Sequence, residues 1–599
     1  MRVAHADLPG ELPAAFGVAR SFAGRKWILR DAGDERAGAL VRAAGVSPVL
    51  ARLLAARGID LQTVEDVLHP TLKRLLPEPN SLLNMERAVD RAADALERGE
   101  RIAVFGDYDV DGACSSALLH DLFSGFGAPP RLYIPDRMTE GYGPTAGALL
   151  RLKDEGADLV ITVDCGATAV EALSAARNAG LDVIVLDHHA VEHPPPAFAQ
   201  VNPNQRGDTS ALTYLCAAGV TFLFAVALNR ALRDRGWHQA RGSAEPDLRR
   251  LLDLVGLATV CDVVPLVGVN RAFVRSGLAQ FDPPQRTGLA ALAAAANASG
   301  PYSPYHLGFV FGPRINAGGR VGRCSLGAEL LIARNTAQAG EIAQALDSHN
   351  RERQAIEKLM LDEAIAMAAL QGNASFLFAA REGWHSGVVG IVAGRLKDRF
   401  GKPAFVAGFE GGMARGSARS VNGVDIGAIV RAAKDAGHLS TGGGHAMAAG
   451  FSLTADQAEG FQRFLAERFG EIGLAHAGVP ELEIDAVISP SGATPELAGE
   501  IALAGPYGAG NPEPLVAACD VRVVFADVVG REHVRMRVSG GDGSRLDAIA
   551  FRSAGSDLGR ALLASRGKTV HLAGRLRADL WNGKTRVQLQ VEDAAPASA

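Results

Sequence analysis

Short apolar runs alternate with helical segments in the first half of the chain. The runs cover residues 102–105, 159–163 and 183–186, and the segments 113–123 and 168–178 carry apolar residues at helical spacing. Strands and helices that alternate in this rhythm predict a parallel sheet with helices on both faces. The expected fold class of this part is therefore α/β.

The pattern changes in the second half of the chain. Residues 341–371 contain neither Gly nor Pro and place apolar residues at helical spacing, which predicts a long connecting helix. Two further apolar runs, 375–379 and 403–406, lie on either side of a segment with helical character, 388–400. These segments predict a second α/β domain over residues 373–460.

Short β runs dominate from about residue 477 onward, and Trp581–Lys584 has the composition of a hairpin turn. Five or six short strands with a basic, partly aromatic face favour an OB-type barrel, a fold that commonly binds single-stranded nucleic acid. A purely structural β domain is the alternative. The runs are 481–485, 521–525, 534–538, 546–551, 569–573 and 586–591.

The length of 599 residues is too great for one hydrophobic core, so several domains are expected. We predict an N-terminal extension, a metal-binding catalytic domain, a helical region with the long helix, a second α/β domain that binds nucleic acid, and a single-strand-binding barrel. Their expected ranges are 1–90, 91–270, 271–372, 373–460 and 461–599.

Acidic residues follow each predicted strand of the first sheet. Asp107, Asp109 and Asp111 come after the first run, Asp164 after the second, and Asp187-His188-His189 after the third; Asp262 follows a further apolar segment. Ligands of open parallel sheets sit outside the carboxyl ends of the strands. The sequence therefore predicts that these side chains converge on one edge of the sheet.

Carboxylates placed that close together repel one another unless cations neutralise them. Asp109, Asp111, Asp164 and Asp262 carry four negative charges, which two divalent ions balance. A carboxylate-rich site with imidazole suits manganese or magnesium, whereas zinc is disfavoured because no pair of cysteines has ligand spacing. Two metal ions and phosphoester hydrolysis are the expected chemistry.

Each acidic segment also has a simpler interpretation. The Asp-x-Asp-x-Asp-Gly segment at 107–112 could open a calcium-binding EF-hand loop, but the twelfth position is Leu118 instead of Glu and a strand is predicted before it. Asp164 alone could cap a helix, and His188 alone could be a hydrogen-bonded core histidine. Only the four segments together favour a metal site.

Composition limits the other possibilities. Hydrophobic residues make up 48% of the chain and charged residues 21%, values that are ordinary for a globular protein. The net charge of −5 argues against coating nucleic acid by bulk attraction, although 395–402 and 575–586 are locally basic. Six scattered cysteines suit a reducing cytoplasm, and no apolar run is long enough to span a membrane.

Four segments resemble, in this order, the motifs of the DHH phosphoesterase family: Gly106–Gly112, Asp164, Asp187–His189 and Asp262. The similarity to one member, a bacterial 5′→3′ exonuclease specific for single strands, runs from about residue 45 to the C-terminus. It is carried by Gly312–Arg320, Gly383–Gly394, Gly416–Ser420, Gly442–Gly450 and Gly505–Pro514. Small departures are Cys261, where Ala is more usual, and Gly318-Gly319, where Ala-Gly is more usual.

The resemblance implies roles for individual residues. Two Mn²⁺ or Mg²⁺ ions would be held by Asp109, Asp111, Asp164, His188 and Asp262, with Asp164 bridging. Asp107 would support them, Asp187 belongs to the third motif, and His189 would contact the phosphate. A 5′-terminal phosphate would be bound by Arg419 and Ser417 with help from Arg320 and Arg137, and DNA would contact Gly443, Gly444 and His445.

The expected activity is hydrolysis of single-stranded DNA from its 5′ end with release of 5′-mononucleotides, in recombination and repair. By the same resemblance a monomer is expected to work beside a helicase and a single-strand-binding protein. The alternatives are an enzyme for very short or cyclic oligonucleotides, a small-molecule pyrophosphatase, and an inactive scaffold. The extra β domain disfavours the first, the number of domains disfavours the second, and the presence of every motif residue disfavours the third.

Overall fold

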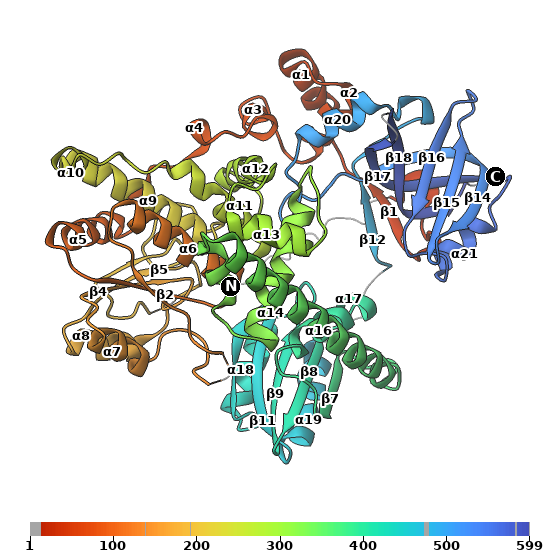
Figure 1. The fold of residues 1–599 in the computed structure, drawn as a ribbon. Coiled ribbons are helices and arrows are strands. Elements are labelled where there is room, and N and C mark those ends of the chain that lie inside the picture. The colour runs from red at the N-terminus through yellow and green to blue at the C-terminus, as the bar shows by residue number, and fades with distance from the viewer. Residues whose placement is uncertain (1–12, 138, 192, 473–478, 582–583, 598–599) are drawn as a thin grey trace, which may run out of the picture. The chain divides into compact units, whose positions relative to one another are not determined.

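The computed structural model describes residues 13–137, 139–191, 193–472, 479–581 and 584–597. The chain forms two compact units (Figure 1). One unit combines the two ends of the chain, residues 1–77 and 477–599, with residues 265–275, and the other contains residues 78–264 and 276–476.

The first sheet of the 78–476 unit is fully parallel, as expected. Its strand order is β3-β2-β4-β5-β6, and β2, β4 and β5 are buried along nearly their whole length. Such strands need cover on both faces, and Figure 1 shows α7 and α8 on one face and α5, α6 and α9 on the other. The strands are Ile102–Gly106 (β2), Arg131–Tyr133 (β3), Leu159–Val163 (β4), Asp182–Leu186 (β5) and Ala199–Val201 (β6).

Polar side chains cap two of the five helices around this sheet. Asp109 caps α6, and Thr145 caps α7 through a hydrogen bond from Ala148 N. The five helices are Met85–Arg98 (α5), Val110–Gly125 (α6), Ala146–Asp154 (α7), Val170–Asn178 (α8) and Ala217–Asp234 (α9).

A helical region follows and contains the expected long helix. This helix, α16, spans Thr336–Ala369 and is capped by the side chain of Asn335. None of the helices in the described part of the chain is long and apolar enough to cross a membrane. The other members are Trp237–Arg241 (α10), Leu252–Cys261 (α11), Val269–Phe281 (α12), Thr287–Ala295 (α13), the π-helical segment His306–Phe311, Gly312–Val321 (α14) and Leu326–Ile332 (α15).

The second sheet of this unit is mixed and has the order β10-β11-β9-β8-β7. Only β7 and β8 run parallel. Its core includes Phe461, Leu465 and Phe469 of α19 (Gln457–Ile472), so it extends past the expected boundary at residue 460. The remaining elements are Leu377–Glu382 (β7), Val389–Phe400 (α17), Ala404–Glu410 (β8), Met413–Arg419 (β9), Ile426–Asp435 (α18), Thr441–His445 (β10) and Ala448–Thr454 (β11).

The C-terminal part of the other unit is the expected OB-type barrel. The strands β14-β15-β16-β18-β17 form a sheet that closes through the additional pairing of β14 with β17. The turn expected at Trp581–Lys584 includes residues 582–583, which lie outside the described residues. The barrel elements are Ala486–Val487 (β13), Pro495–Leu503 (α20), Val516–Val529 (β14), His533–Ser539 (β15), Arg545–Ala550 (β16), Asp557–Leu563 (α21), Thr569–Trp581 (β17) and Lys584–Pro596 (β18).

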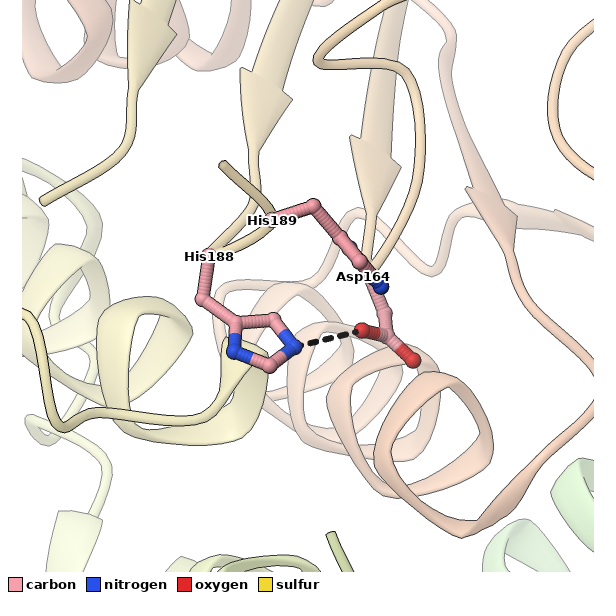
Figure 2. A group of neighbouring side chains, drawn as sticks. All are labelled: Asp164, His188 and His189. Carbon is pink, nitrogen blue, oxygen red and sulfur yellow. Dashed lines mark ion pairs between the residues drawn. The ribbon is translucent and has the colours of Figure 1, made fainter. Parts of the chain in front are cut away.

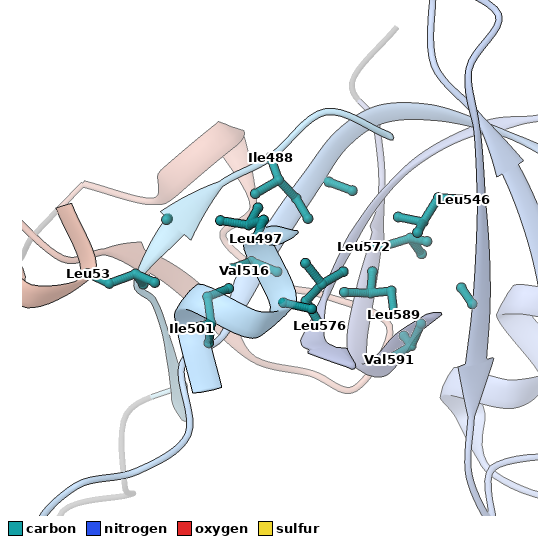
Figure 3. Close-up of a cluster of buried hydrophobic side chains, with 14 of the residues drawn as sticks. Leu53, Ile488, Leu497, Ile501, Val516, Leu546, Leu572, Leu576, Leu589 and Val591 are labelled. Carbon is teal, nitrogen blue, oxygen red and sulfur yellow. The ribbon is translucent and has the colours of Figure 1, made fainter. Parts of the chain in front are cut away.

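The N-terminal segment packs on this barrel, which the sequence did not predict. Strand β1 (Lys26–Leu29) pairs in parallel with β12 (Glu481–Ile484). Leu53 of the N-terminal segment shares one apolar cluster with Leu497, Leu572 and Leu589 of the barrel (Figure 3). The N-terminal helices are Asp34–Ala44 (α1), Pro48–Ala56 (α2), Val64–Leu68 (α3) and Leu72–Leu75 (α4).

Candidate active site

The acidic side chains converge at the carboxyl edge of the parallel sheet, as the strand pattern predicts. Asp107 follows β2, Asp164 follows β4, and Asp187 follows β5. Figure 2 shows Asp164 and His188 turned toward each other. Three groups each bring possible ligand atoms within 4.8 Å of one another: Asp107, Asp109 and Asp164; Asp111, His188 and Asp262; and Asp164, His188 and His189.

Asp109 and Asp111 are fixed by the beginnings of two helices. Asp109 Oδ1 accepts hydrogen bonds from Asp111 N at 2.9 Å and Gly112 N at 3.1 Å, at the start of α6. The Asp111 carboxylate accepts from Ala217 N at 2.7 Å and Ala218 N at 2.8 Å, at the start of α9. Helix N-termini favour negative charge, so both carboxylates are held in place before any cation binds.

Gly112 allows this turn to be tight. A Cβ atom at this position would lie 2.5 Å from the carbonyl oxygen of Asp107. The glycine of the Asp-x-Asp-x-Asp-Gly segment is thus required by the return of the chain over Asp107. The EF-hand interpretation does not hold, because β2 precedes the segment and Leu118 lies inside α6.

Asp164 occupies a strained backbone conformation, with φ at 60°. Non-glycine residues in this region are uncommon and cluster at functional sites. Its side chain is 2% exposed. The nearest helix, α8, begins at Val170 and has Ala169 at its cap position, so the helix-cap interpretation of Asp164 is wrong.

Asp187 orients its two neighbouring histidines. Its Oδ1 accepts hydrogen bonds from His188 N at 2.7 Å and His189 N at 3.2 Å, and lies 2.7 Å from His189 Nδ1. This arrangement fixes the His189 ring through Nδ1 and turns Nε2 away from Asp187. Burial would raise the pKa of the Asp187 carboxyl, but the hydrogen bond with His189 and the charges of both imidazoles lower it overall.

Two asparagines that the sequence analysis missed hold the same loop. Asn204 Nδ2 donates to the carbonyl oxygen of His188 at 2.6 Å, and Asn202 Nδ2 donates to that of His189 at 2.8 Å. Both asparagines follow β6, the strand after the histidines. The sequence did contain a signal for them, because two amide side chains directly follow the next strand after the histidines.

His188 faces three carboxylates without a close hydrogen bond to any. Its Nε2 lies 3.4 Å from Asp164 Oδ1, 3.6 Å from Asp262 Oδ2 and 3.8 Å from Asp111 Oδ2. Asp262 comes from the C-terminal end of helix α11 and not from a strand. Distances of this size are long for hydrogen bonds and suit atoms that face a common cation.

The electrostatics of the centre also fit divalent ions. Burial raises the pKa of Asp107 and Asp164 well above the ordinary range, and neighbouring carboxylates raise both further. Burial, Asp111 and Asp109 raise the pKa of Asp262 to about 9. Asp107 Oδ1 and Asp262 Oδ2 are buried and have no hydrogen-bond partner. A hard dication removes the repulsion and satisfies these oxygens.

Tyr142, another residue that the sequence analysis missed, lies beside the histidines. Its hydroxyl donates to the carbonyl oxygen of Asp164 at 3.2 Å and lies 3.5 Å from His189 Nε2. The ring packs edge-on to His189 with centroids 6.1 Å apart. Tyr142 therefore restricts the free face of His189. No local sequence signal marked it, because it comes from a loop between β3 and α7.

Arg320 and Arg419 line one cavity of about 320 Å³, whose walls include Gly390 and Gly394. Arg419 Nη1 donates to Ser417 Oγ at 2.7 Å, and Arg320 Nη1 donates to the carbonyl oxygen of Gly387 at 2.9 Å. Burial and then the nearby arginine charges lower the pKa of Arg320 to about 10.

The carboxylate of Asp398 also lines this cavity, where it pairs with Lys397 at 2.6 Å. Arg137, Arg320 and Arg419 make no ion pair with a carboxylate among the described residues. Arg137 instead lies over the ring of Tyr108, 5.3 Å from the ring centroid. Tyr108 is the residue between Asp107 and Asp109 in the sequence. Partly buried guanidinium groups without acids are costly unless an anion completes them, and phosphate suits their geometry.

The register of the second sheet relates the glycine-rich strand β10 to β9, which carries Ser417 and Arg419 and is separated from β10 by β11. Ser417 pairs with Gly450, which pairs with Gly443; Arg419 pairs with Ala448, which pairs with His445. Four of the expected DNA-binding residues therefore lie in two rows across the sheet, and Gly444, which pairs with Ala449, lies between these rows. A Cβ at Gly443 would meet no atom within 4 Å, so this position leaves room for a phosphate.

Gly444 has a different reason to be glycine. Its φ is 144°, and a Cβ there would lie 2.5 Å from the carbonyl oxygen of Ala448. The turn between β10 and β11 thus accounts for this residue without any ligand.

The basic stretches of the sequence are largely paired with acids. Arg577 Nη2 lies 2.5 Å from Glu513 Oε2, and Arg575 Nη1 lies 2.8 Å from Glu592 Oε2. In the other stretch Arg395 pairs with Glu357 at 3.3 Å. Arg320 and Arg419, in contrast, are far apart in the sequence, so they do not form a basic stretch that the sequence analysis could detect.

Comparison with known proteins gives one consistent family. The models for the DHH family N-terminal domain, the DHHA1 domain and the RecJ OB domain match residues 101–259, 373–471 and 484–593. The chain is 35% identical to the single-stranded-DNA-specific exonuclease RecJ of Escherichia coli over 92% of this chain and 96% of that protein. It is 33% identical to the protein of that name from Bacillus subtilis, over 95% of this chain and 71% of that protein.

The fold agrees with the sequence comparison. The crystal structure of RecJ in complex with Mn²⁺ from Thermus thermophilus matches with a TM-score of 0.79 and 29% identity, over 96% of this chain and 79% of that one. The Mg²⁺ complex of the same protein matches with a TM-score of 0.74. Both the sequence and the fold identify the chain as a member of the RecJ family.

Proposed function

We propose that this protein is a metal-dependent exonuclease that degrades single-stranded DNA from its 5′ end and releases 5′-mononucleotides. Its relatives are named single-stranded-DNA-specific exonucleases. The 5′ polarity is supported by helix α14, which has one residue beside the acidic centre and another at the arginine cavity. Asn316 Oδ1 accepts a hydrogen bond from Val110 N at 3.1 Å beside the acidic centre, and Arg320, one helical turn later, lines the arginine cavity.

This spacing supports release of one nucleotide at a time. One helical turn advances about 5.4 Å, which is comparable with the separation of successive phosphates in a strand. A terminal phosphate in the arginine cavity therefore leaves the next phosphate at the acidic centre. Cleavage there detaches one nucleotide that carries its own 5′-phosphate.

Two Mn²⁺ or Mg²⁺ ions fit the acidic centre. Of the three groups of possible ligands, Asp107, Asp109 and Asp164 would hold one ion, and Asp111, His188 and Asp262 would hold the second. Asp164 Oδ1 lies 3.4 Å from His188 Nε2, which supports a bridging role for Asp164. When bound, the ions supply Lewis-acid stabilisation of the phosphate and a nucleophilic water.

The protein groups orient and stabilise the reacting phosphate. Asp187 fixes His189 through Nδ1, and burial, which lowers the pKa of His189, is outweighed by this hydrogen bond, so that the pKa is about 9. A protonated His189 would donate from Nε2 to a non-bridging phosphate oxygen and stabilise its growing charge. Arg419, Ser417 and Arg320 hold the terminal phosphate by charge-assisted hydrogen bonds.

The barrel offers a separate surface that suits unpaired bases. A cavity of about 730 Å³ on its surface is lined by Phe525, Arg535, Arg537 and Arg586. Arg535 and Arg566 each lie 5.7 Å from the ring centroid of Phe525. An aromatic ring surrounded by arginines is a common platform for unpaired bases. By family resemblance we place the activity in the cytoplasm, in repair and recombination beside a helicase and a single-strand-binding protein.

A time course on 5′-phosphorylated single-stranded DNA labelled at its 3′ end tests the function. With Mn²⁺ we expect products that shorten one nucleotide at a time from the 5′ end, and none from blunt duplex. The Asp164→Ala variant should lose turnover and keep its fold. Tight binding without cleavage by the wild-type protein would support the scaffold alternative, and cleavage restricted to very short oligonucleotides would support the other enzyme class.

A further inference from the structure

Two exposed aromatic rings lie immediately before α14. Tyr305 and Phe309 are 62% and 72% exposed. Their rings stack on each other with centroids 5.2 Å apart and planes inclined by 21°. Single exposed apolar side chains are ordinary, but a stacked pair concentrates apolar surface in one place and indicates a contact surface.

The pair belongs to the same helical stretch as the site residues. Phe309 lies in the π-helical segment His306–Phe311, which continues directly into α14. Asn316 follows Phe309 by seven residues and Arg320 follows by eleven, close to two and three whole turns of a helix. Phe309, Asn316 and Arg320 therefore lie on one face, in this order along the axis.

The position of the pair is fixed relative to the acidic centre. The Cys261 thiol, next to Asp262, donates to the carbonyl oxygen of Leu307 at 3.3 Å. A Cβ at Gly308 would come within 3.2 Å of Val260 Cγ1, and a Cβ at Gly312 within 2.5 Å of Cys261 Sγ. The helix that supplies Asp262 thus packs closely against the segment that supplies the rings, and π-helical turns are frequent at functional sites.

The order along α14 sets where a bound strand runs. Arg320 and Asn316 are about 6 Å apart along the axis, and Asn316 and Phe309 about 10 Å, at about 1.5 Å per residue. A strand with its terminal phosphate at Arg320 and its next phosphate at the acidic centre continues toward Phe309. The bases that reach the rings belong to the third and fourth nucleotides.

We propose that Tyr305 and Phe309 form a stacking platform for these two bases, on the 3′ side of the cleaved bond. This assignment rests on the proposed function, because the arginine cavity sets the direction of the strand. Stacking accepts every base, which suits an enzyme that must pass along any sequence. Bases inside a duplex are already stacked and paired, so the platform also favours unpaired ends.

The test uses Tyr305→Ala, Phe309→Ala and the double variant. The conservative variants Tyr305→Phe and Phe309→Trp should retain the platform. Leu359→Ala is the matched control, because Leu359 is a large apolar residue that is 68% exposed on α16. First-cleavage rates are measured under single-turnover conditions with Mn²⁺ over a range of enzyme concentrations. This separates strand affinity from the rate of the bound complex.

Three 5′-phosphorylated substrates distinguish the outcomes: a 20-nucleotide strand, the same strand without bases at nucleotides 3 and 4, and a dinucleotide. We expect the double variant to raise the enzyme concentration needed for half-saturation on the intact strand by roughly 30-fold or more, because two stacked bases each contribute about 1–3 kcal/mol. The maximal rate should change little. The loss should vanish on the strand that lacks those bases and on the dinucleotide, and the conservative variants should behave like the wild type.

An equal loss on all three substrates, or no loss on the intact strand, would overturn the platform. The first result would mean that the rings only support the fold of the site. Failure of the wild-type protein to cleave any 5′-phosphorylated strand would overturn the proposed function itself, and is distinguishable because it does not depend on the variants.

Discussion

Replacing Arg419 by alanine should remove most of the preference for a 5′-phosphorylated end. Arg419 lines the arginine cavity and pairs with no carboxylate among the described residues, so its charge is available to a bound phosphate. A hydrogen bond to a charged group contributes about 1.5–3 kcal/mol. The expected loss in kcat/KM on 5′-phosphorylated single strands is therefore roughly ten- to 150-fold.

The assay compares 5′-phosphorylated and 5′-hydroxyl strands for the wild-type protein and three variants. On the 5′-hydroxyl strand Arg419→Ala should change little, because the group that it binds is already missing. Arg419→Lys should recover only part of the loss, since an ammonium group lacks the bidentate fork. Arg415→Ala is the matched control, because Arg415 is an exposed residue of the same strand, β9, and does not line the cavity.

The comparison with Asp164→Ala separates binding from chemistry. That variant should lose turnover while it keeps its affinity for phosphorylated ends. Equal losses for Arg419→Ala on the two kinds of strand, or equal losses of binding in Arg419→Ala and Asp164→Ala, would refute the assignment of the terminal phosphate to this cavity.

Three further predictions concern the metal, the positioning of His189 and the glycine-rich strand. Because the pKa of Asp262 is raised to about 9, folded metal-free protein keeps a proton that the unfolded chain loses, so its Tm should fall as pH rises from 6 to 9. Mn²⁺ should raise Tm more at pH 8 than at pH 6, because the ion must displace the proton from the carboxylates that hold it. Calorimetry of chelated protein with and without added Mn²⁺ measures this difference, and an equal rise at both pH values would contradict the shared carboxylate site. Asp187→Asn should lower kcat by roughly tenfold or more and shift its pH profile, because His189 loses its charged partner; an unchanged profile would exclude this positioning role. Gly444→Ala should lower Tm by strain in the turn, whereas Gly443→Ala should leave Tm unchanged and weaken strand binding, as fluorescence anisotropy can measure; the reverse pattern would remove Gly443 from the binding surface.

The strand ends were predictable because their signal is local. An apolar run followed by Asp107 or Asp164 is enough to place the carboxylate at the edge of a parallel sheet. Asp262 was found as an acid beside an apolar segment, but its position at the end of a helix needed the structure. Its neighbours in space come from strands far away in the sequence.

The supporting residues were not predictable from local pattern. Asn316 touches the first motif from more than 200 positions away, and Asn204 acts through a backbone oxygen, which leaves no trace in composition. The basic stretch at 575–586 suggested free positive charge, but Arg577 is paired with Glu513, which lies 64 positions away in the sequence. Such partners are set by tertiary packing, which periodicity does not encode.

The pairing of β1 with β12 has a consequence for the synthesis of the chain. Trp27 and Asp593 are completely buried, and the indole of Trp27 donates to the carboxylate of Asp593 at 3.1 Å. At about 5–20 residues per second, the ribosome needs roughly half a minute or more to make the residues between them. All of the residues 78–476 leave the ribosome before β12 does, so the N-terminal segment must wait with its apolar side chains uncovered, at the stage when chaperones are most needed.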